Sequence, residues 1–333
     1  AKSLLSADER EFLPVMEDGL TGVVAELDTG RPGKTLAFRF DIDGVDVTES
    51  KDEAHRPFKE GFRADIDGIT HACGHDGHTT VGLALAALLT RFKEELNGTV
   101  KLCFQPAEEG VRGAHAMVAS GVVDDVDYML GAHFGFKMKR TGSIACNVTD
   151  FLATSKYDAR FTGVPAHAGA APEQGKNALL AAACAALNLH AIARHSAGAS
   201  RVNVGRLDAG SGRNIIGDKA LLCLETRGAT SGINTYMERE AERVIKAAAM
   251  MYDTQVELQK VGGAAGGSNS PKLAAFLERE ARALGIFDEV VGECPFGASE
   301  DFVFHGTRAV AWRRGSLHDG RRESCRRASR LPF

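Results

Sequence analysis

The sequence predicts an α/β fold, in which helices cover both faces of a mostly parallel sheet, with an inserted α+β domain. In the first half, strand-like segments such as "KTLAFRFDID" and "TVKLCFQ" alternate with helix-like segments such as "TTVGLALAALLTRFKEEL". This alternation is typical of parallel sheets that are covered on both faces. After residue 152 the pattern changes to four strands and two long helices, which indicates a separate sandwich.

The first domain is expected at residues 1–151 and again at 264–307. It opens with two strands around the turn "GRPG", which predicts a hairpin-like pair. A helix is expected from near Thr79, with Thr79 or Asp76 as its cap. "GAHAMVASGVV" and "PKLAAFLEREARALG" predict further helices, and "VDYMLGAHF" predicts another strand.

The inserted domain is expected at residues 152–263. Its strands are predicted at "TSKYDARFTG", "SRVNVGRLDAG", "ALLCLETRG" and "TQVELQKVGG", and its helices at "GKNALLAAACAALNLHAIARH" and "INTYMEREAERVIKAAAMMY". The small and polar residues of "GGAAGGSNSP" mark the return to the first domain.

Composition excludes several classes of protein. A net charge of -4 gives no indication of nucleic-acid or membrane binding. No apolar run reaches the length of a membrane span, and the start lacks the apolar core of a signal peptide. Seven scattered cysteines fit a reducing cytoplasm better than a disulfide framework.

Residues 308–333 break this composition, with eight arginines and almost no periodic apolar signal. A disordered basic tail is the plainest interpretation. A nucleic-acid arm is disfavoured because aromatic residues are not interleaved with the arginines. An altered reading frame or a truncated gene product would also explain this end of the chain.

Ligand-type side chains gather where predicted strands end. "HACGHDGHTT" places three histidines, Cys73 and Asp76 on a connection that leads into a helix. The carboxyl ends of parallel strands share one edge of a sheet, where ligands bind. Thiolate, imidazole and carboxylate groups together suit a site for two divalent ions, zinc or manganese. The strand ends supply Asp41, Asp43, Glu108, Glu109 and His133.

Each of these residues also has an ordinary interpretation. Cys73 alone suits a buried small side chain, His133 a core histidine, and Glu108 with Glu109 the solvated start of a helix. Asp41 and Asp43 would then be turn residues. Their convergence on one sheet edge favours the metal site, with one glutamate as ligand and the other as proton shuttle. The positive end of the helix would favour a Cys73 thiolate, and His71 and His78 would support the ligands.

Six motifs in order resemble the aminoacylase/carboxypeptidase G family of metallopeptidases: "HACGHDGHT", "GTVKLCFQPAEEG", "GAHFG", "FTGVPAHAGAAP", "GSGRNIIG" and "GASEDF". The cysteine in the first motif points to the amidohydrolase branch. The likeness runs from about Gly19 to Phe302. It implies a metallopeptidase domain with a lid and dimerisation domain, and a site for two ions of manganese or zinc. The implied metal ligands are Cys73, His75, Glu109 and His133.

The resemblance also implies roles for the remaining polar residues. Glu108 matches the general base, and Asp43 matches the acidic residue that orients the site. His167 matches a histidine of the lid domain that reaches a neighbouring subunit's active site and stabilises the oxyanion. Asn214 and Arg227 match groups that hold the substrate's carboxylate or oxyanion. The expected assembly is a dimer through the lid domain, either of two copies of this chain or with a homologous second subunit.

The implied reaction is hydrolysis of the amide bond of an N-acyl amino acid by metal-activated water. The resemblance favours p-aminobenzoyl-glutamate, which would give p-aminobenzoate and glutamate. Two alternatives stay open: an aminoacylase for other N-acyl amino acids, and an inactive or truncated relative that acts only as a partner subunit. A thiol hydrolase that uses Cys73 is a further alternative. A zinc deaminase is disfavoured because no P-C-x-x-C follows the histidines.

The sequence departs from the family at both ends. Its relatives carry a longer segment before the stretch that matches "MEDGLTGVVAELDTG". The family's last metal ligand is a histidine beyond the "SEDF" motif, in a context that neither His305 nor His318 has. Neither residue is therefore assigned as a ligand.

Overall fold

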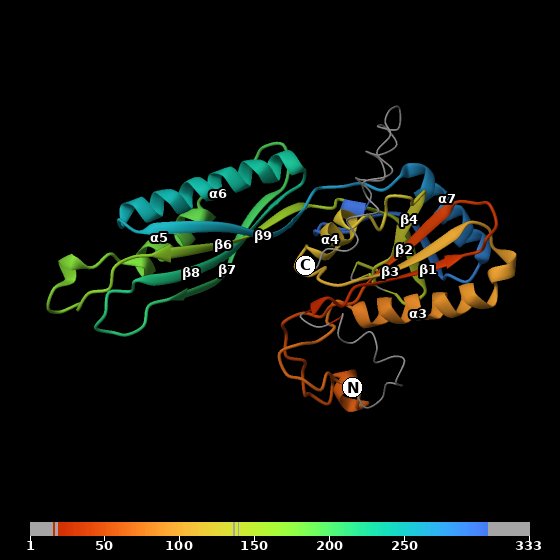
Figure 1. The fold of residues 1–333 in the computed structure, drawn as a ribbon, viewed down its shortest axis with the longest axis horizontal. Helices are drawn as coiled ribbons and strands as arrows, with labels where there is room; N and C mark the ends of the chain where they lie inside the picture. Colours follow the sequence, from red (N-terminus) through yellow and green to blue (C-terminus); the bar gives the residue numbers. More distant parts are fainter. Residues whose placement is uncertain (1–15, 17–18, 136, 139, 306–333) are drawn as a thin grey trace.

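The computed structural model describes residues 16, 19–135, 137–138 and 140–305, and it has the α/β fold that the sequence predicts. Two layered units lie side by side, joined by two chain connections (Figure 1). We propose domain limits at 151/152 and 263/264, at these connections. The basic segment 308–333 lies outside the described residues. None of the helices in the described part is long and apolar enough to cross a membrane.

The larger unit is built on a four-stranded sheet. Its strands are β1 (Val23–Asp28), β2 (Thr35–Asp41), β3 (Thr99–Gln105) and β4 (Tyr128–Gly131), in the order β1-β3-β2-β4. β2 pairs in parallel with β3 and with β4, whereas β1 runs antiparallel to β3. The predicted hairpin between the first two strands is therefore wrong, because β3 lies between them.

Helices cover both faces of this sheet. α3 (His75–Arg91) packs closely on one face, since a Cβ at Gly82 would lie 2.6 Å from Phe104 and 2.8 Å from Phe40. α4 (Gly113–Ala119) packs on the other face, where Val118 shares a core cluster with Ala37. Adjacent residues of a strand point to opposite faces, so β2 contributes side chains to the hydrophobic core on each face of the sheet.

A second, two-stranded sheet lies beside the first. It consists of β5 (Ser143–Thr149) and β10 (Glu289–Pro295), paired in parallel, with α7 (Pro271–Leu284) packed against it. The sequence predicted α7 but not these two strands, which pair across more than a hundred residues of chain. The short helices α2 (Arg56–Lys59), η3 (Lys93–Glu95) and η4 (Pro172–Gln174) lie in connections.

The smaller unit has the four strands and two helices that the sequence predicts. They are β6 (Ala153–Thr162), β7 (Ser200–Ala209), β8 (Lys219–Gly228), β9 (Gln255–Ala264), α5 (Ala178–His190) and α6 (Ser231–Met251). The strand order is β7-β8-β6-β9, antiparallel throughout. Residues of both helices share a core cluster with Phe161 and Leu222, so they cover one sheet face and leave the other for contacts elsewhere.

Candidate metal centre

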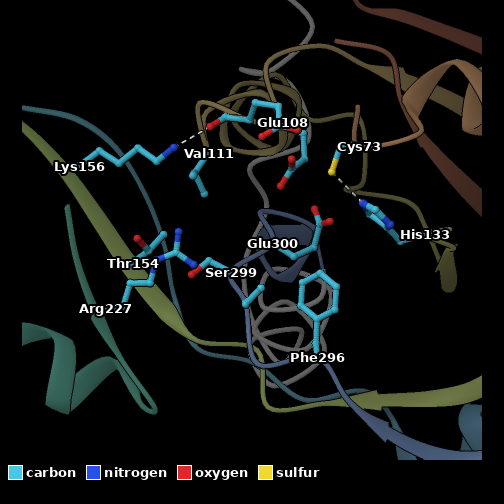
Figure 2. Close-up of a pocket in the computed structure, with 12 residues that line it drawn as sticks. Cys73, Glu108, Val111, His133, Thr154, Lys156, Arg227, Phe296, Ser299 and Glu300 are labelled. Carbon is cyan, nitrogen blue, oxygen red and sulfur yellow. Dashed lines mark hydrogen bonds between the residues drawn. The ribbon is translucent and has the colours of Figure 1, made fainter. Parts of the chain in front are cut away.

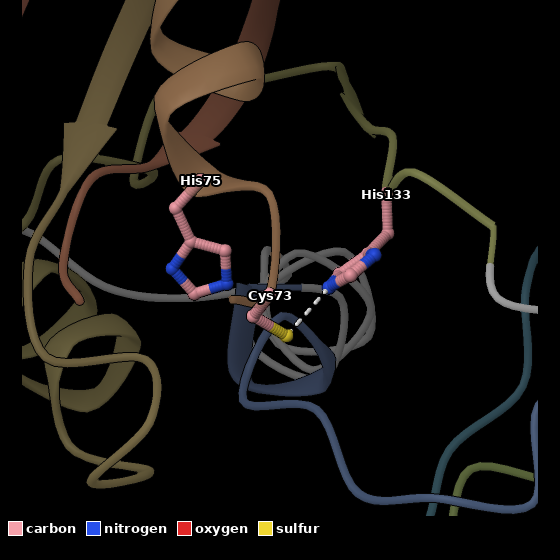
Figure 3. A group of neighbouring side chains, drawn as sticks. All are labelled: Cys73, His75 and His133. Atoms are coloured by element: carbon pink, nitrogen blue, oxygen red, sulfur yellow. Dashed lines mark hydrogen bonds between the residues drawn. The ribbon is translucent and has the colours of Figure 1, made fainter. Parts of the chain in front are cut away.

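The side chains of the predicted site come together at the carboxyl edge of the larger sheet. The donor atoms of Cys73, His75 and His133 lie within 4.8 Å of one another, as do those of His75, Glu108 and Glu109. Figure 3 shows Cys73 between the two imidazoles. The two clusters share His75, so the donors form one continuous group.

A left-handed glycine sets the direction of the Cys73–His75 segment. Gly74 has φ 86° and is the N-cap of α3, which begins at His75. The predicted caps are wrong: no side chain caps α3, and the Thr79 hydroxyl donates instead to the His75 carbonyl oxygen. Only a residue that tolerates positive φ allows Cys73 and His75 to point toward the same centre.

Asp43 lies beside His75. Its Oδ1 lies 3.3 Å from His75 Nδ1, while its Oδ2 accepts a hydrogen bond from Glu109 N at 3.0 Å. Burial disfavours a charged imidazole, but the nearby Asp43 carboxylate, Cys73 thiol and Asp41 carboxylate outweigh it and raise the pKa of His75 to about 11. The surroundings of His75 therefore favour positive charge strongly.

Cys73 and His133 face each other, with Sγ 3.5 Å from Nε2. His133 Nδ1 donates to the carbonyl oxygen of Phe134 at 2.7 Å, which fixes the tautomer that leaves Nε2 with a free lone pair. The nearby His75 ring lowers the pKa of the Cys73 thiol, but burial and the Glu109 carboxylate raise it above its usual value. The predicted thiolate is therefore not favoured by the helix alone and needs a cation beside it.

His78 lies beside these donors, and one of its ring nitrogens groups with donor atoms of Asp41 and His75 within 4.8 Å. Its Nε2 accepts from Phe134 N at 2.8 Å, so Nδ1 carries the proton and donates to the buried Asp41. Both ring nitrogens thus have hydrogen-bond partners, and the supporting role of His78 stays a prediction. His71 is exposed.

Glu108 and Glu109 lie on a tight turn after β3. Ala107 and Val111, on either side of them, have φ of 57° and 54°, a region that non-glycine residues seldom adopt. The Glu108 side chain is buried. Burial, together with the Glu300 carboxylate, raises its pKa to about 9. The turn therefore holds a carboxyl group that keeps a proton readily.

The chemistry of these residues fits a divalent metal centre. Among the described residues, several buried polar atoms here have no hydrogen-bond partner: Asp43 Oδ1, both His75 ring nitrogens and Glu109 Oε1. Unpaired polar atoms in a protein interior are costly unless a ligand or an ion satisfies them. Sulfur, nitrogen and carboxylate donors gathered in this way suit zinc or manganese.

A cavity of about 170 Å³ opens beside the donors, between the two units. In Figure 2, Cys73 and His133 lie on one side of it, and Glu108 and Glu300 project toward its middle. The opposite side comes from the smaller unit, with Thr154, Lys156 and Arg227. The structure thus brings Arg227 to the site, where its guanidinium is paired with Glu225 through Nε at 2.9 Å and Nη2 at 3.1 Å.

The structure does not bring His167 and Asn214 to this cavity. They lie together beyond the far ends of β6 and β8, where Ala168 N donates to the Asn214 carbonyl oxygen at 2.9 Å. A ten-residue strand such as β6 is about 33 Å long, so these residues are remote from the donors of their own chain. Both are exposed.

A polar network that the sequence did not predict lies behind the donors. Buried Arg39 contacts Asp41 at 2.8 Å and both Glu300 and Asp301 at 2.9 Å. Gln105 accepts from Arg39 Nε and donates to Asp301, and buried His305 bonds to the same Gln105 oxygen. The arginine in "FRFDID" and the acidic pair in "GASEDF" were the available signals.

Comparison with known proteins places these observations in a family. A sequence model described as "Peptidase family M20/M25/M40" matches residues 37–326, so the match extends past Phe302, where the likeness in the sequence was expected to end. This segment contains every donor described above.

Individual relatives agree with this match. The indole-3-acetyl-aspartic acid hydrolase of Enterobacter agglomerans is 53% identical over 87% of this chain and 66% of its own length. One of the subunits of the p-aminobenzoyl-glutamate hydrolase of Escherichia coli is 52% identical over 87% of this chain and 67% of its own length. A solved aminobenzoyl-glutamate utilization protein from Klebsiella pneumoniae superposes with a TM-score of 0.78 at 45% identity, covering 92% of this chain and 71% of that one. The chain thus spans about two thirds of the length of the curated relatives it matches.

Proposed function

Because this chain belongs to peptidase family M20/M25/M40, we propose that it is a metal-dependent amidohydrolase. Its substrate is an N-acyl amino acid, p-aminobenzoyl-glutamate, which it splits into p-aminobenzoate and glutamate. The two donor clusters that share His75 carry this proposal. The similar proteins named as hydrolases of p-aminobenzoyl-glutamate and of indole-3-acetyl-aspartic acid support the choice of substrate.

Cys73, His75, Glu109 and His133 would hold two divalent ions, manganese or zinc. Bound there, such ions would supply Lewis-acid polarisation of the amide carbonyl and a lower pKa for nearby water. Asp43 would keep the His75 ring in one orientation, as carboxylates commonly do for histidine ligands. His78 and Asp41 would support the same cluster from behind.

Glu108 would be the general base. Its buried carboxylate is close to the shared donor His75 and does not need to ligate an ion itself. It would take a proton from the attacking water and return it to the leaving amine. Positive charge beside Glu108 would bring its raised pKa down toward the range that suits this exchange.

The smaller unit would act as a lid that binds the substrate. Arg227 would hold the α-carboxylate, because a guanidinium binds a carboxylate through two parallel hydrogen bonds. His167 and Asn214 would serve the site of a partner protomer, since they are remote from the donors of their own chain. The partner would be a second copy of this chain or a homologous protein, and the cysteine pattern favours the cytoplasm as the compartment.

Metal removal tests the reaction. Dialysis against a chelator is expected to abolish hydrolysis of p-aminobenzoyl-glutamate, and added manganese or zinc is expected to restore it. Elemental analysis of the active protein is expected to give two ions per chain. Cys73→Ser should lower the metal content, because serine is a poor replacement for a thiolate ligand.

Cys184→Ser is the matched control, because Cys184 lies on α5 and is remote from the donor clusters. It should keep both ions and full activity. Hydrolysis that survives the chelator but is lost on thiol alkylation would identify a Cys73-dependent thiol hydrolase instead. A stable dimer without metal or hydrolysis would identify a partner protein without a catalytic function.

Mixing two inactive variants tests the role of the lid histidine. Glu108→Gln and His167→Ala should each be inactive alone, but a dimer with one of each keeps one intact site. Random exchange of protomers should therefore restore about a quarter of the wild-type activity. A mixture no more active than its components would show that His167 does not serve the partner's site.

A further inference from the structure

We propose that Lys156 makes the site selective for acidic amino acids by binding the side-chain carboxylate of the substrate. This inference rests on the proposed function and adds to it the class of amino acid that is released. Lys156 lines the same cavity as Cys73, Glu108 and His133, but on the side that the smaller unit supplies. Figure 2 shows its side chain extending toward the turn that carries Glu108 and Val111.

Strand register places Lys156 beside the residue proposed for the α-carboxylate. Alternate residues of a strand share one face, so Thr154 and Lys156 point into the cavity together. Thr154 lies directly opposite Arg227 on β8. Two cationic side chains, Lys156 and Arg227, therefore project from one sheet face into one cavity.

Lys156 has no carboxylate partner among the described side chains. Glu225 lies directly opposite it on β8, but that carboxylate is taken by both bonds to Arg227. The Lys156 ammonium instead donates to the main-chain oxygen of Glu109 at 2.6 Å. An ammonium has three donors, so two stay available for a ligand.

The backbone holds this ammonium next to the metal centre. The pairing of β6 with β9 is irregular between Lys156 and Tyr157, and such bulges redirect side chains near active sites. On β9, Gly263 N donates to Val111 O at 3.2 Å, and a Cβ on Gly262 would lie 2.2 Å from Gly110 O. The strand pair thus packs directly on the turn that carries Glu108 and Glu109.

This arrangement divides the recognition of a dicarboxylic amino acid between two cations. The α-carboxylate is common to every N-acyl amino acid, and the planar fork of Arg227 suits it. The second carboxylate is present only in acidic amino acids, and it meets the ammonium of Lys156. A charge-assisted hydrogen bond of this kind discriminates against a neutral amide of the same shape.

Binding of p-aminobenzoyl-glutamate and p-aminobenzoyl-glutamine, measured by calorimetry on the full chain with manganese, tests the proposal. The Glu108→Gln background prevents turnover, so the measurement does not depend on catalysis. The background protein is expected to bind the glutamate ligand at least about 10-fold more tightly than the glutamine ligand. Adding Lys156→Met should reduce this preference to within about 2-fold, whereas Lys156→Arg should keep it.

Lys219→Met is the matched control, because this substitution removes the same charge from the same sheet. Lys219 is exposed and lies at the end of β8 that is far from the cavity. The control should leave the preference unchanged. If Lys156 only fastened the lid to the Glu109 turn, Lys156→Met would weaken both ligands equally and keep their ratio, which would overturn the proposal. No preference in the background protein, or no binding of either ligand, would also overturn it. Hydrolysis by the wild-type chain is measured separately. Metal-dependent hydrolysis without an effect of Lys156→Met on the preference would therefore support the proposed function and overturn only this inference.

Discussion

Glu108→Gln is expected to keep its metal content and to lose at least about 100-fold in kcat for amide hydrolysis. Glutamine fills the same buried space but cannot accept the proton of the attacking water or return it to the leaving amine. The donor atoms of Cys73, His75, Glu109 and His133 are untouched by the change. Steady-state kinetics on p-aminobenzoyl-glutamate, together with elemental analysis of the same preparation, measures both quantities.

Two further variants make this result specific. Glu109→Gln should lower the metal content as well as the rate, because it alters a proposed ligand rather than the base. Glu173→Gln changes an exposed glutamate of η4 and should leave both quantities unchanged. Near-full activity of Glu108→Gln would refute the role of Glu108 as base, and loss of metal would mean that Glu108 is itself a ligand.

Local patterns in the sequence predicted most of the elements, but they did not predict which strands pair. The "GRPG" turn suggested that β1 and β2 form a hairpin, yet the start of β3 lies between their ends. Gly98 N donates to Arg31 O at 2.9 Å, and Thr99 N donates to Lys34 O at 3.1 Å. A Cβ on Gly33 would lie 2.5 Å from Gly98 N, so two glycine turns pack against each other there. The pairing of β1 and β2 with β3 depends on residues after position 97, so the local sequence around the "GRPG" turn could not predict it.

The convergence of the candidate metal ligands could be predicted because their positions follow from local rules. Cys73 and His75 lie in one short motif, and Glu109 and His133 follow strands whose carboxyl ends meet at one edge. Lys156 offered no such signal, because a lysine within a strand is usually a solvated residue. Its contact with Glu109 depends on how the two units pack, which the sequence pattern does not encode.

The capping residues of α3 show a similar limit. Thr79 and Asp76 are good cap residues in isolation, but the helix begins earlier, at His75. The left-handed conformation of Gly74 and the burial of His75 determine this start. The position of His75 within the donor cluster therefore determines where the helix begins, and it overrides the local preference for a polar cap.

Arg39→Met is expected to destabilise the fold by about 3–5 kcal/mol, because it leaves buried carboxylates without their cation. Asp41, Glu300 and Asp301 all contact this guanidinium, and all three carboxylates are buried. Burial disfavours the charged form of Arg39, but the surrounding carboxylates outweigh it and hold the pKa of Arg39 above its usual value. The arginine is therefore charged in the folded protein, and its positive charge holds β2 against the "SEDF" segment.

Chemical denaturation monitored by circular dichroism measures this loss. Arg39→Lys should recover only part of the stability, because a single ammonium cannot reproduce the directed bonds to Asp41, Gln105 and Glu300. Arg160→Met, which removes an exposed pair with Asp158, should change stability by less than about 1 kcal/mol. An Arg39→Met variant as stable as the wild type would show that the carboxylates take up protons on losing the arginine, and the pH dependence of its unfolding would then shift with them.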